Sequence, residues 1–351
     1  MPASEQLMFA GAVGPKRKGH VLLISPLTFT YREFICATLN ELGYDVTWWN
    51  ERASDSTLYK AALRISPVLT RAVSERIFSE RIRELTPREI TLVLVIKGEG
   101  LTSAICSELR ACLPGVPMGY YLWDSRSNVR SAPEISAALD ATSTFDPVDA
   151  HTYAWYYRPL FSRYGPVTPS PMGARDFDWC FVGTLHSDRH RVLSQLRKSG
   201  KPGSRSYVFG FCPSSAVLKL RYLTDWSLWR SESTISTTPL SAEAVSSIIA
   251  RSRVVVDVEH PRQRGLTMRT IETLVSGSKL ATTNASIVES DLFHPSRVHI
   301  LDRRKPYIPE EFINAPFSAF DPGVLERYSA STWARDLIHF ALSGSANRPV
   351  T

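Results

Sequence analysis

The alternation of apolar runs and amphipathic stretches is clearest between residues 253 and 284. Residues 254–258 are apolar apart from Asp257, which predicts a buried parallel strand. After a polar loop, residues 268–276 show the 3.6-residue period of a helix, and a glycine follows them. A second strand is expected to begin at Lys279. Together these segments form a βαβ unit, and the N-terminus of such a helix can hold a phosphate group.

The same pattern recurs along the chain. The first half predicts strands at residues 20–25, 44–49, 90–96, 117–123 and 141–145, and helices at 31–42, 58–85 (with a break near Pro67) and 102–112. The second half predicts strands at 177–182, 206–211, 254–258 and 279–284, and helices at 189–199, 241–250, 268–276 and 331–342. Alternating strands and helices indicate an α/β protein with parallel, doubly wound sheets. The Gly-x-Gly-x-x-Gly fingerprint is absent, which argues against a standard NAD or FAD domain.

A stretch rich in proline and glycine separates the two halves and is typical of a linker. We therefore expect an N-terminal Rossmann-like domain over residues 1–160, a linker over 161–175 and a C-terminal Rossmann-like domain over 176–330. Residues 331–351 are expected to form a C-terminal helix and tail. A chain of 351 residues is too long for one ordinary core, which also favours two domains.

Composition narrows the class of protein. Hydrophobic residues make up 43% and charged residues 21%, as in ordinary globular proteins, and no apolar run approaches the roughly 20 residues that span a bilayer. The N-terminal apolar residues precede the basic residues 16–18, the reverse of a secretory signal, so a cytoplasmic location is expected. The five cysteines contain no Cys-x-x-Cys pair, which indicates neither a zinc site nor a disulfide framework.

The formal net charge of +7 favours anionic partners such as phosphates, acidic sugars or an anionic membrane surface. The basic residues are spread along the chain, and no helix-turn-helix, RNP or zinc-finger pattern accompanies them. Nucleic acid is therefore not expected as a partner.

Ligands of open α/β sheets bind beyond the carboxyl ends of the strands. That rule selects the polar residues that follow four predicted strands: Lys97, Gly98, Glu99, Asp124, Ser125, Arg126, Gly183, Thr184, His186, Arg189, Glu259, His260 and Arg269. If the two edges face each other, a ligand cleft lies between the domains. On helix 268–276, Arg269 and Glu272 share a polar face that suits the phosphate and ribose of a nucleotide.

Each of these positions also has a structural interpretation. The alternatives are a surface ion pair for Arg269 and Glu272, a turn glycine for Gly183, an N-cap for Asp124, a solvated pair with Lys97 for Glu99, a loop histidine for His186 and a turn for His260–Pro261.

Residues 239–284 resemble the nucleotide-sugar half of GT-B glycosyltransferases, in which a helix, a strand, a loop, a helix with a ribose-binding glutamate, a glycine and a strand follow one another. More narrowly, the chain resembles bacterial glycosyltransferases of the lipopolysaccharide, capsule and spore-maturation type. The segments that carry this resemblance are LVLVIKGEGLT (92–102), YYLWDS (120–125), FDPVD (145–149), FVGTLHSDR (181–189) and HPRQRGLTMRTIE (260–272). It implies two Rossmann-like domains that face a central cleft.

The resemblance also implies roles for individual residues. Glu272 would hydrogen-bond the ribose hydroxyls, Thr267 and the amides of its helix start would face the diphosphate, and Arg269 would pair with its charge. Members of the family often carry a second glutamate, which contacts the donor sugar, at the position held here by Arg264. That departure leaves the identity of the sugar open.

The glycine-containing loop at the first strand of the C-terminal domain is matched by Gly183 and Thr184. By the same resemblance, His186 and Arg189 would reach the phosphate or the donor sugar.

Glycosyl transfer places negative charge on the leaving phosphate, and helix-end amides and arginines can stabilise that charge without a metal or a further cofactor. Asp176 and Asp178 have Asp-x-Asp spacing but open a strand, so they lack the context of a metal-dependent transferase. An inverting enzyme needs a base for the acceptor hydroxyl, and Asp124 and Glu99 are the candidates. A retaining enzyme could proceed without one, so the stereochemistry stays open.

Other functions remain compatible with the sequence. The His260–Pro261 pair resembles one in transferases that use CMP-linked acid sugars of the Kdo or sialic type. A nucleotide-sugar epimerase and a non-catalytic relative of these folds are further alternatives.

Residues 217–230 predict a helix with aromatic and basic residues, which suits an anionic lipid interface. We therefore expect a glycan or lipid-linked acceptor and a peripheral position at the inner membrane. The alternative is that this face packs on the core of the C-terminal domain.

Overall fold

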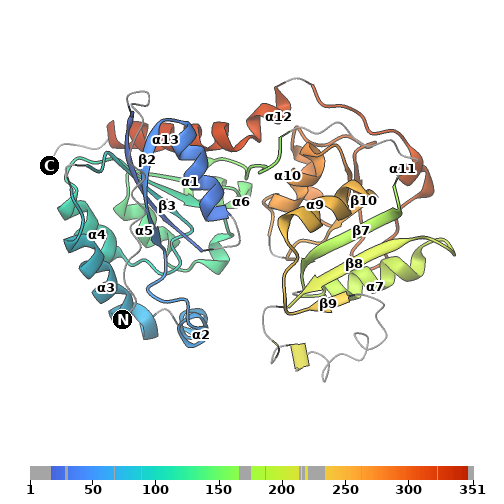
Figure 1. Cartoon of the computed structure of the whole chain (residues 1–351), viewed down its shortest axis with the longest axis horizontal. Helices are drawn as coiled ribbons and strands as arrows, with labels where there is room; N and C mark the ends of the chain where they lie inside the picture. Colours follow the sequence, from blue (N-terminus) through green and yellow to red (C-terminus); the bar gives the residue numbers. More distant parts are fainter. Residues whose placement is uncertain are drawn as a thin grey trace. The chain divides into compact units, whose positions relative to one another are not determined.

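The computed structural model describes residues 17–27, 31–66, 68–87, 89–165, 175–185, 187–212, 215, 218–219, 234–261, 263–321 and 323–346. Its strands form two six-stranded sheets, and neighbouring strands run parallel in each described pairing. The expected α/β class with two Rossmann-like sheets is confirmed (Figure 1).

The first sheet has the strand order β2-β1-β3-β4-β5-β6. Its strands are β1 (Gly19–Ser25), β2 (Tyr44–Asn50), β3 (Leu92–Ile96), β4 (Met118–Leu122), β5 (Ala141–Thr144) and β6 (Tyr156–Tyr157). The helices among them are α1 (Tyr31–Glu41), α2 (Thr57–Ile65), α3 (Val68–Arg83), α4 (Ser103–Cys112), α5 (Ala132–Ala138) and α6 (Pro147–Tyr153), with a short 3-10 turn, η1 (Arg126–Asn128). Strands β3 and β4 are buried along their whole length, which explains their continuous apolar sequences.

The C-terminal helix α13 (Ala330–Ala346) packs against β4 at Gly119. A Cβ atom at Gly119 would lie 2.9 Å from the Cβ of Ala341, so only glycine allows this close approach. The helix predicted over residues 331–342 is thus confirmed, and it extends four residues further.

The second sheet has the order β12-β11-β10-β7-β8-β9. Its strands are β7 (Phe177–Thr184), β8 (Ser206–Phe211), β9 (Thr234–Ser236), β10 (Ser252–Asp257), β11 (Lys279–Thr282) and β12 (Val298–Ile300). The accompanying helices are α7 (Arg189–Ser199), α9 (Ala242–Ala250), α10 (Met268–Val275), α11 (Glu310–Asn314) and α12 (Val324–Arg327), with a 3-10 turn, η3 (Ala285–Glu289).

Alternate side chains of β7 and β10 supply two cores, one on each face of this sheet. Phe181 and Val256 belong to the core that includes residues of α7, whereas Val255 belongs to the core that includes Ile248 and Ile249 of α9. The period-2 alternation of the strands therefore buries both faces under helices.

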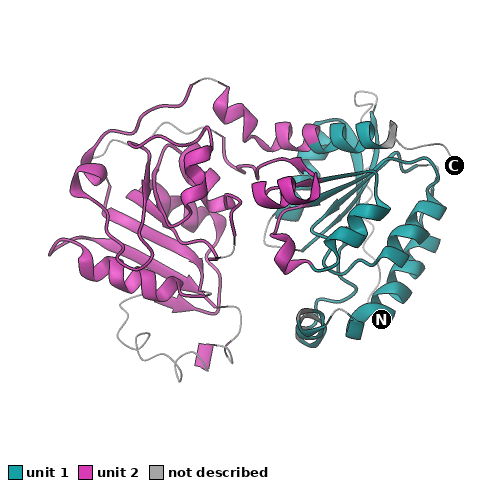
Figure 2. Ribbon diagram, turned by 180° about the vertical axis from the view of Figure 1, so that it is seen from behind, with its two compact units in different colours: residues 1–121, 130–142, 337–351 teal, residues 122–129, 143–336 magenta. Residues whose placement is uncertain are grey.

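The chain divides into two compact units (Figure 2). The first comprises residues up to 121, residues 130–142 and the chain from 337 onward; the second comprises residues 122–129 and 143–336. Segment 143–165, with α6 and β6, thus belongs to the second unit. The division of the sequence into domains 1–160 and 176–330 with a linker at 161–175 stays a prediction.

Candidate functional site

Helix α10 begins directly beyond the carboxyl end of β10. The hydroxyl of Thr267 caps the helix by accepting the N–H of Thr270 at 3.0 Å, and it donates to the Asp257 carboxylate. The hydroxyl of Thr270 donates to the same carboxylate at 2.8 Å. Because the Thr267 side chain is used in this way, the groups at this helix start that remain for a ligand are backbone amides.

Arg269 and Glu272 lie one turn apart, as the sequence predicts. Nη1 of Arg269 lies 3.7 Å from Oε2 of Glu272. The alternative of an ordinary surface pair is wrong, because the side chain of Glu272 is only 2% exposed. Nη1 of Arg269 is buried and has no hydrogen-bond partner. A buried guanidinium nitrogen without an acceptor is costly, and a phosphate oxygen would satisfy it.

Glu272 also forms an ion pair that the sequence did not indicate. Nε of Arg163 donates to Oε1 of Glu272 at 2.8 Å, and both side chains are largely buried. Arg163 lies 109 positions away in the chain, just after β6. The candidate ribose-binding carboxylate is therefore held in place by a residue from outside the βαβ unit.

Arg189 bridges the carboxyl ends of β7 and β10. Its Nη1 donates to the carbonyl of Thr184 at 2.8 Å, and its Nε donates to the carbonyl of Val258. Burial lowers the pKa of Arg189, and its cationic neighbours Arg303 and Arg269 lower it further, against the opposing effect of Asp257 and Glu259. The structure thus brings Arg189 and Arg269 to the same edge of the sheet.

Arg303 also lies at this edge, although the sequence pattern did not indicate it. It pairs with Asp188 and with Glu259, each at 2.6 Å. Arg303 follows β12, and the rule that selected the other residues would have selected it if this three-residue strand had been recognised.

The other predicted positions at this edge are placed as follows. Gly183 lies inside β7, so its interpretation as a turn glycine is wrong; a Cβ there would lie 3.1 Å from the Phe181 ring. The carbonyl of His260 accepts the N–H of Gln263 at 2.9 Å, which forms the expected turn. His186 lies outside the described residues.

In the first unit, Glu99 belongs to a mostly buried charged cluster after β2 and β3. Its carboxylate pairs with Arg52 at 2.5 Å and with Lys97 at 3.4 Å, and it is 14% exposed, so a solvated pair is the wrong description. Burial opposes its charge, but Lys97 and Arg52 outweigh burial and hold the pKa of Glu99 below its ordinary value.

Glu51 completes this cluster and was also missed, although it follows a predicted strand. Its Oε2 accepts the N–H of Glu99 at 2.8 Å, while its buried Oε1 has no hydrogen-bond partner. Burial raises the pKa of Glu51 to about 7, against the opposing effect of Lys97 and Arg52. Two adjacent carboxyl groups with pKa values shifted in opposite directions are typical of sites that handle protons.

Asp124 lies beyond the carboxyl end of β4, as expected. Its Oδ1 accepts the N–H of Ser125 at 3.0 Å and the side-chain amide of Asn128 at 2.8 Å. These bonds link Asp124 to residues of the η1 turn, but the N-cap of that turn is Ser125, so the interpretation of Asp124 as its N-cap is wrong. The carboxylate is half-buried.

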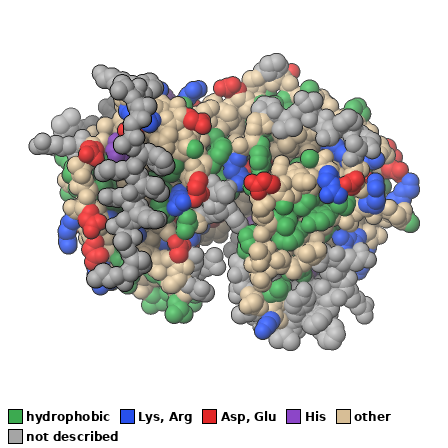
Figure 3. All heavy atoms as spheres, in the orientation of Figure 1, with side chains coloured by type: hydrophobic (Ala, Val, Ile, Leu, Met, Phe, Trp, Pro, Cys, Tyr) green, Lys and Arg blue, Asp and Glu red, His purple; other side chains and the backbone are tan. Residues whose placement is uncertain are grey.

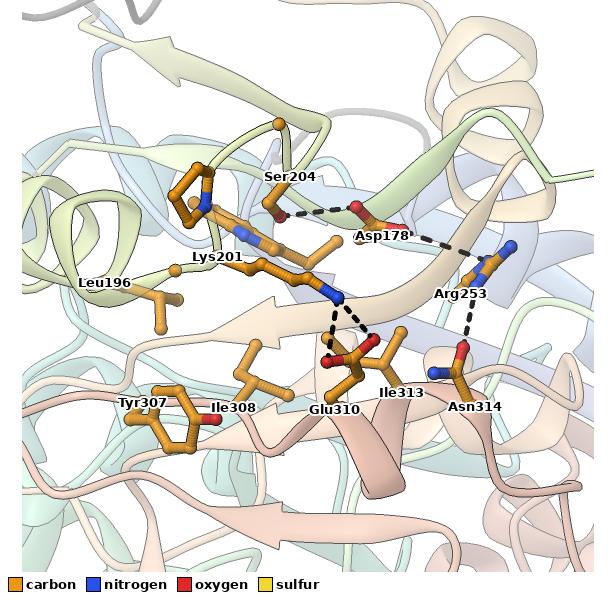
Figure 4. Close-up of a pocket in the computed structure, with 14 residues that line it drawn as sticks. Asp178, Leu196, Lys201, Ser204, Arg253, Tyr307, Ile308, Glu310, Ile313 and Asn314 are labelled. Carbon is orange, nitrogen blue, oxygen red and sulfur yellow. Dashed lines mark hydrogen bonds and ion pairs between the residues drawn. The ribbon is translucent and has the colours of Figure 1, made fainter.

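A cavity of about 290 Å³ lies at the opposite edge of the second sheet (Figure 4). Asp178 and Arg253, near the amino ends of β7 and β10, line it together with Lys201 and Glu310, which form an ion pair at 3.0 Å. Ligands of parallel sheets bind at the carboxyl edge, so this cavity is not the nucleotide site. Asp176 pairs with Arg251 at 2.5 Å, and β7 starts between Asp176 and Asp178, which confirms that the Asp-x-Asp sequence opens a strand.

On the face shown in Figure 3, apolar side chains of the second unit gather in one patch, with charged side chains beside it. Among the described residues, no cluster of histidine, cysteine, aspartate or glutamate could hold a metal ion. Within the same residues, no helix is long and apolar enough to cross a membrane.

Apart from Leu218 and Lys219, the aromatic and basic segment 217–230 lies outside the described part of the chain.

No protein-family model and no curated protein matches the chain. Several solved structures have a similar fold. An α,α-trehalose-phosphate synthase (UDP-forming) from Burkholderia xenovorans, in complex with glucose-6-phosphate, has a TM-score of 0.61 at 10% identity over 92% of this chain and 100% of that chain. Anabaena HepE in complex with UDP and glucose has a TM-score of 0.56 at 10% identity over 92% and 99%. The UDP complex of Staphylococcus aureus MnaA has a TM-score of 0.58 at 10% identity over 94% and 100%.

Proposed function

The chain has the GT-B fold, and we propose that it is a glycosyltransferase that uses a nucleotide-sugar donor. The observation that carries the proposal is the start of α10, where Nη1 of Arg269 has no hydrogen-bond partner and lies 3.7 Å from the buried carboxylate of Glu272. Oxygen atoms of a phosphate would accept hydrogen bonds from the guanidinium, and a carboxylate accepts them from ribose hydroxyls. The fold supports the proposal, because two solved structures of similar fold contain UDP.

In the proposed reaction the acceptor oxygen bonds to the anomeric carbon while the bond from that carbon to the phosphate breaks. The electron pair of that bond leaves with the nucleotide diphosphate. We propose that Arg269 and the amides at the start of α10 stabilise this charge without a metal ion, aided by Arg189. Asp124 and Glu99 are the proposed proton acceptors for the hydroxyl of the acceptor.

The proposed acceptor is a bacterial surface glycan or a lipid-linked sugar at the cytoplasmic face of the inner membrane. Support comes from the net charge of +7 and from the aromatic and basic segment 217–230. Co-sedimentation with anionic vesicles should show binding that weakens as salt rises. The absence of binding at low salt would remove the membrane from the proposal.

A nucleotide-sugar epimerase is the second candidate, because MnaA, an epimerase, shares the fold. A CMP-linked acid sugar as donor is the alternative within the first candidate, supported by His260–Pro261. Thermal-shift measurements with UDP, GDP and CMP identify the base, and product analysis with the corresponding labelled nucleotide sugar separates the functions. A transferase releases nucleotide and labels an acceptor, whereas an epimerase converts the sugar and keeps the nucleotide attached.

A further inference from the structure

Asp146 is a buried carboxylate in the FDPVD segment that the proposed reaction does not use. It is 3% exposed and lies where β5 ends and α6 begins. Its Oδ1 caps α6 by accepting the N–H groups of Val148 at 3.0 Å and Asp149 at 3.4 Å. One oxygen of Asp146 is therefore used locally, which leaves Oδ2 for more distant partners.

Oδ2 of Asp146 accepts hydrogen bonds from two other segments. The N–H groups of Arg264 and Gly265, in the loop before α10, donate to it at 3.3 and 3.4 Å. The hydroxyl of Ser125, next to Asp124, donates at 3.3 Å. A single carboxylate thus joins the loop that leads into α10 to the turn that carries a candidate base.

The loop is held by two further contacts. A Cβ atom at Gly265 would lie 2.5 Å from the ring of Phe145, so this glycine lies directly on the aromatic side chain that precedes Asp146. The side-chain amide of Asn284 donates to the carbonyls of Arg264 and Gly265 at 3.2 and 3.3 Å. Both the N–H groups and the carbonyls of Arg264 and Gly265 are therefore held by hydrogen bonds. Gly265 lies two residues before Thr267, which caps α10.

We propose that Asp146 is a positioning residue for the nucleotide donor, and this inference rests on the proposed function. By holding the N–H groups of Arg264 and Gly265, it fixes the loop so that the start of α10 keeps the orientation in which a diphosphate binds. An amide at this position would retain one acceptor oxygen but turn an NH₂ group toward backbone N–H donors. Asparagine prefers to keep its oxygen on the helix N–H groups at an N-cap, so its NH₂ group would face the loop, and the loop would lose its anchor.

The test compares Asp146→Asn with Asp149→Asn. Asp149 belongs to the same segment and accepts the N–H of Arg126 at 2.8 Å, but no described hydrogen bond joins it to the loop. Two quantities are measured in each variant: hydrogen exchange of the peptide covering residues 261–267 without nucleotide, and the dissociation constant for UDP, GDP and CMP by calorimetry. Asp146→Asn should speed exchange and weaken binding about tenfold, the loss of roughly one good hydrogen bond. Asp149→Asn should change neither.

Unchanged exchange in Asp146→Asn would overturn the inference, and so would faster exchange with unchanged nucleotide affinity. If the wild-type protein binds none of the nucleotides, the proposed function fails and this inference fails with it, whereas the exchange data still show whether Asp146 anchors the loop. Should Asp146→Asn not fold, Gly265→Ala displaces the same loop from the side of Phe145. Gly265→Ala should then produce the same two changes, and their absence would also contradict the inference.

Discussion

Nε of Arg163 lies 2.8 Å from Oε1 of Glu272, so a buried ion pair joins the segment after β6 to the candidate nucleotide-binding helix. Both charges are largely removed from water, and removal of Arg163 takes the 2.8 Å partner away from a buried carboxylate. This relationship gives Glu272 a fixed orientation before any ligand binds.

Replacement of Arg163 by alanine should therefore destabilise the protein by about 3 kcal/mol or more, as expected for a broken buried pair. The double variant Arg163→Ala with Glu272→Gln should recover part of that loss, because residue 272 then no longer carries a buried charge that has lost Arg163. Urea unfolding at pH 7 measures both effects. A loss below about 1 kcal/mol, the level of an exposed ion pair, would show that the pair contributes little.

Separate variants of Asp124 and Glu99 test which of the two carboxylates is the base. Loss of a general base costs on the order of 10²–10⁴ in rate, so one of Asp124→Asn and Glu99→Gln should lower the turnover number by that amount while donor binding persists. Near wild-type turnover in both variants would remove both residues from the mechanism and favour a retaining reaction.

The pH dependence of activity tests whether Glu99 is the base. Lys97 and Arg52 hold the pKa of Glu99 below its ordinary value of 4.5. A base acts in its deprotonated form, so activity should persist as pH falls and decline only below pH 4.5, as far as the protein stays folded. A decline centred near pH 6 or 7 would contradict this assignment.

We predict that Glu51 makes the free energy of unfolding fall as pH rises from 4.5 to about 7. Its pKa is raised from 4.5 to about 7 in the folded protein, so the folded state binds the proton more tightly than the unfolded state. The contribution of Glu51 is complete below pH 4.5 and is lost as pH rises to about 7, by up to ~3 kcal/mol. Glu51→Gln should remove this slope from the unfolding free energy, whereas the exposed Glu89→Gln should keep it. Parallel pH curves for Glu51→Gln and the wild type would contradict the prediction.

The sequence predicted most of the long elements because burial on both faces of a parallel sheet leaves a clear apolar pattern. The helix expected at residues 268–276 is observed at Met268–Val275, and Gly277 follows with a left-handed φ of 69°. Short elements were missed, although Asp146 and Pro147 form an N-cap and first-turn proline that signal the start of α6.

The candidate site was only partly predictable. Arg269, Glu272 and Arg189 could be found because they follow strands that the apolar pattern reveals. Arg163 could not be found, because its contact with Glu272 depends on packing between segments 109 residues apart. The hydrogen bonds of Asp146 to residues 264–265 could not be found either, because they also depend on packing between segments that are far apart in the sequence.

Calorimetric titration of the wild-type protein with UDP, GDP and CMP measures whether the start of α10 binds a nucleotide. We predict that one of these nucleotides binds and that Glu272→Gln and Arg269→Ala each weaken it about ten- to hundredfold, which corresponds to roughly 1.5–3 kcal/mol for a charge-assisted contact. Glu311→Gln, an exposed carboxylate on α11, is the matched control and should bind like the wild type. Absence of binding by all three nucleotides, or equal affinity in the wild type and both site variants, would show that the start of α10 is not a nucleotide site.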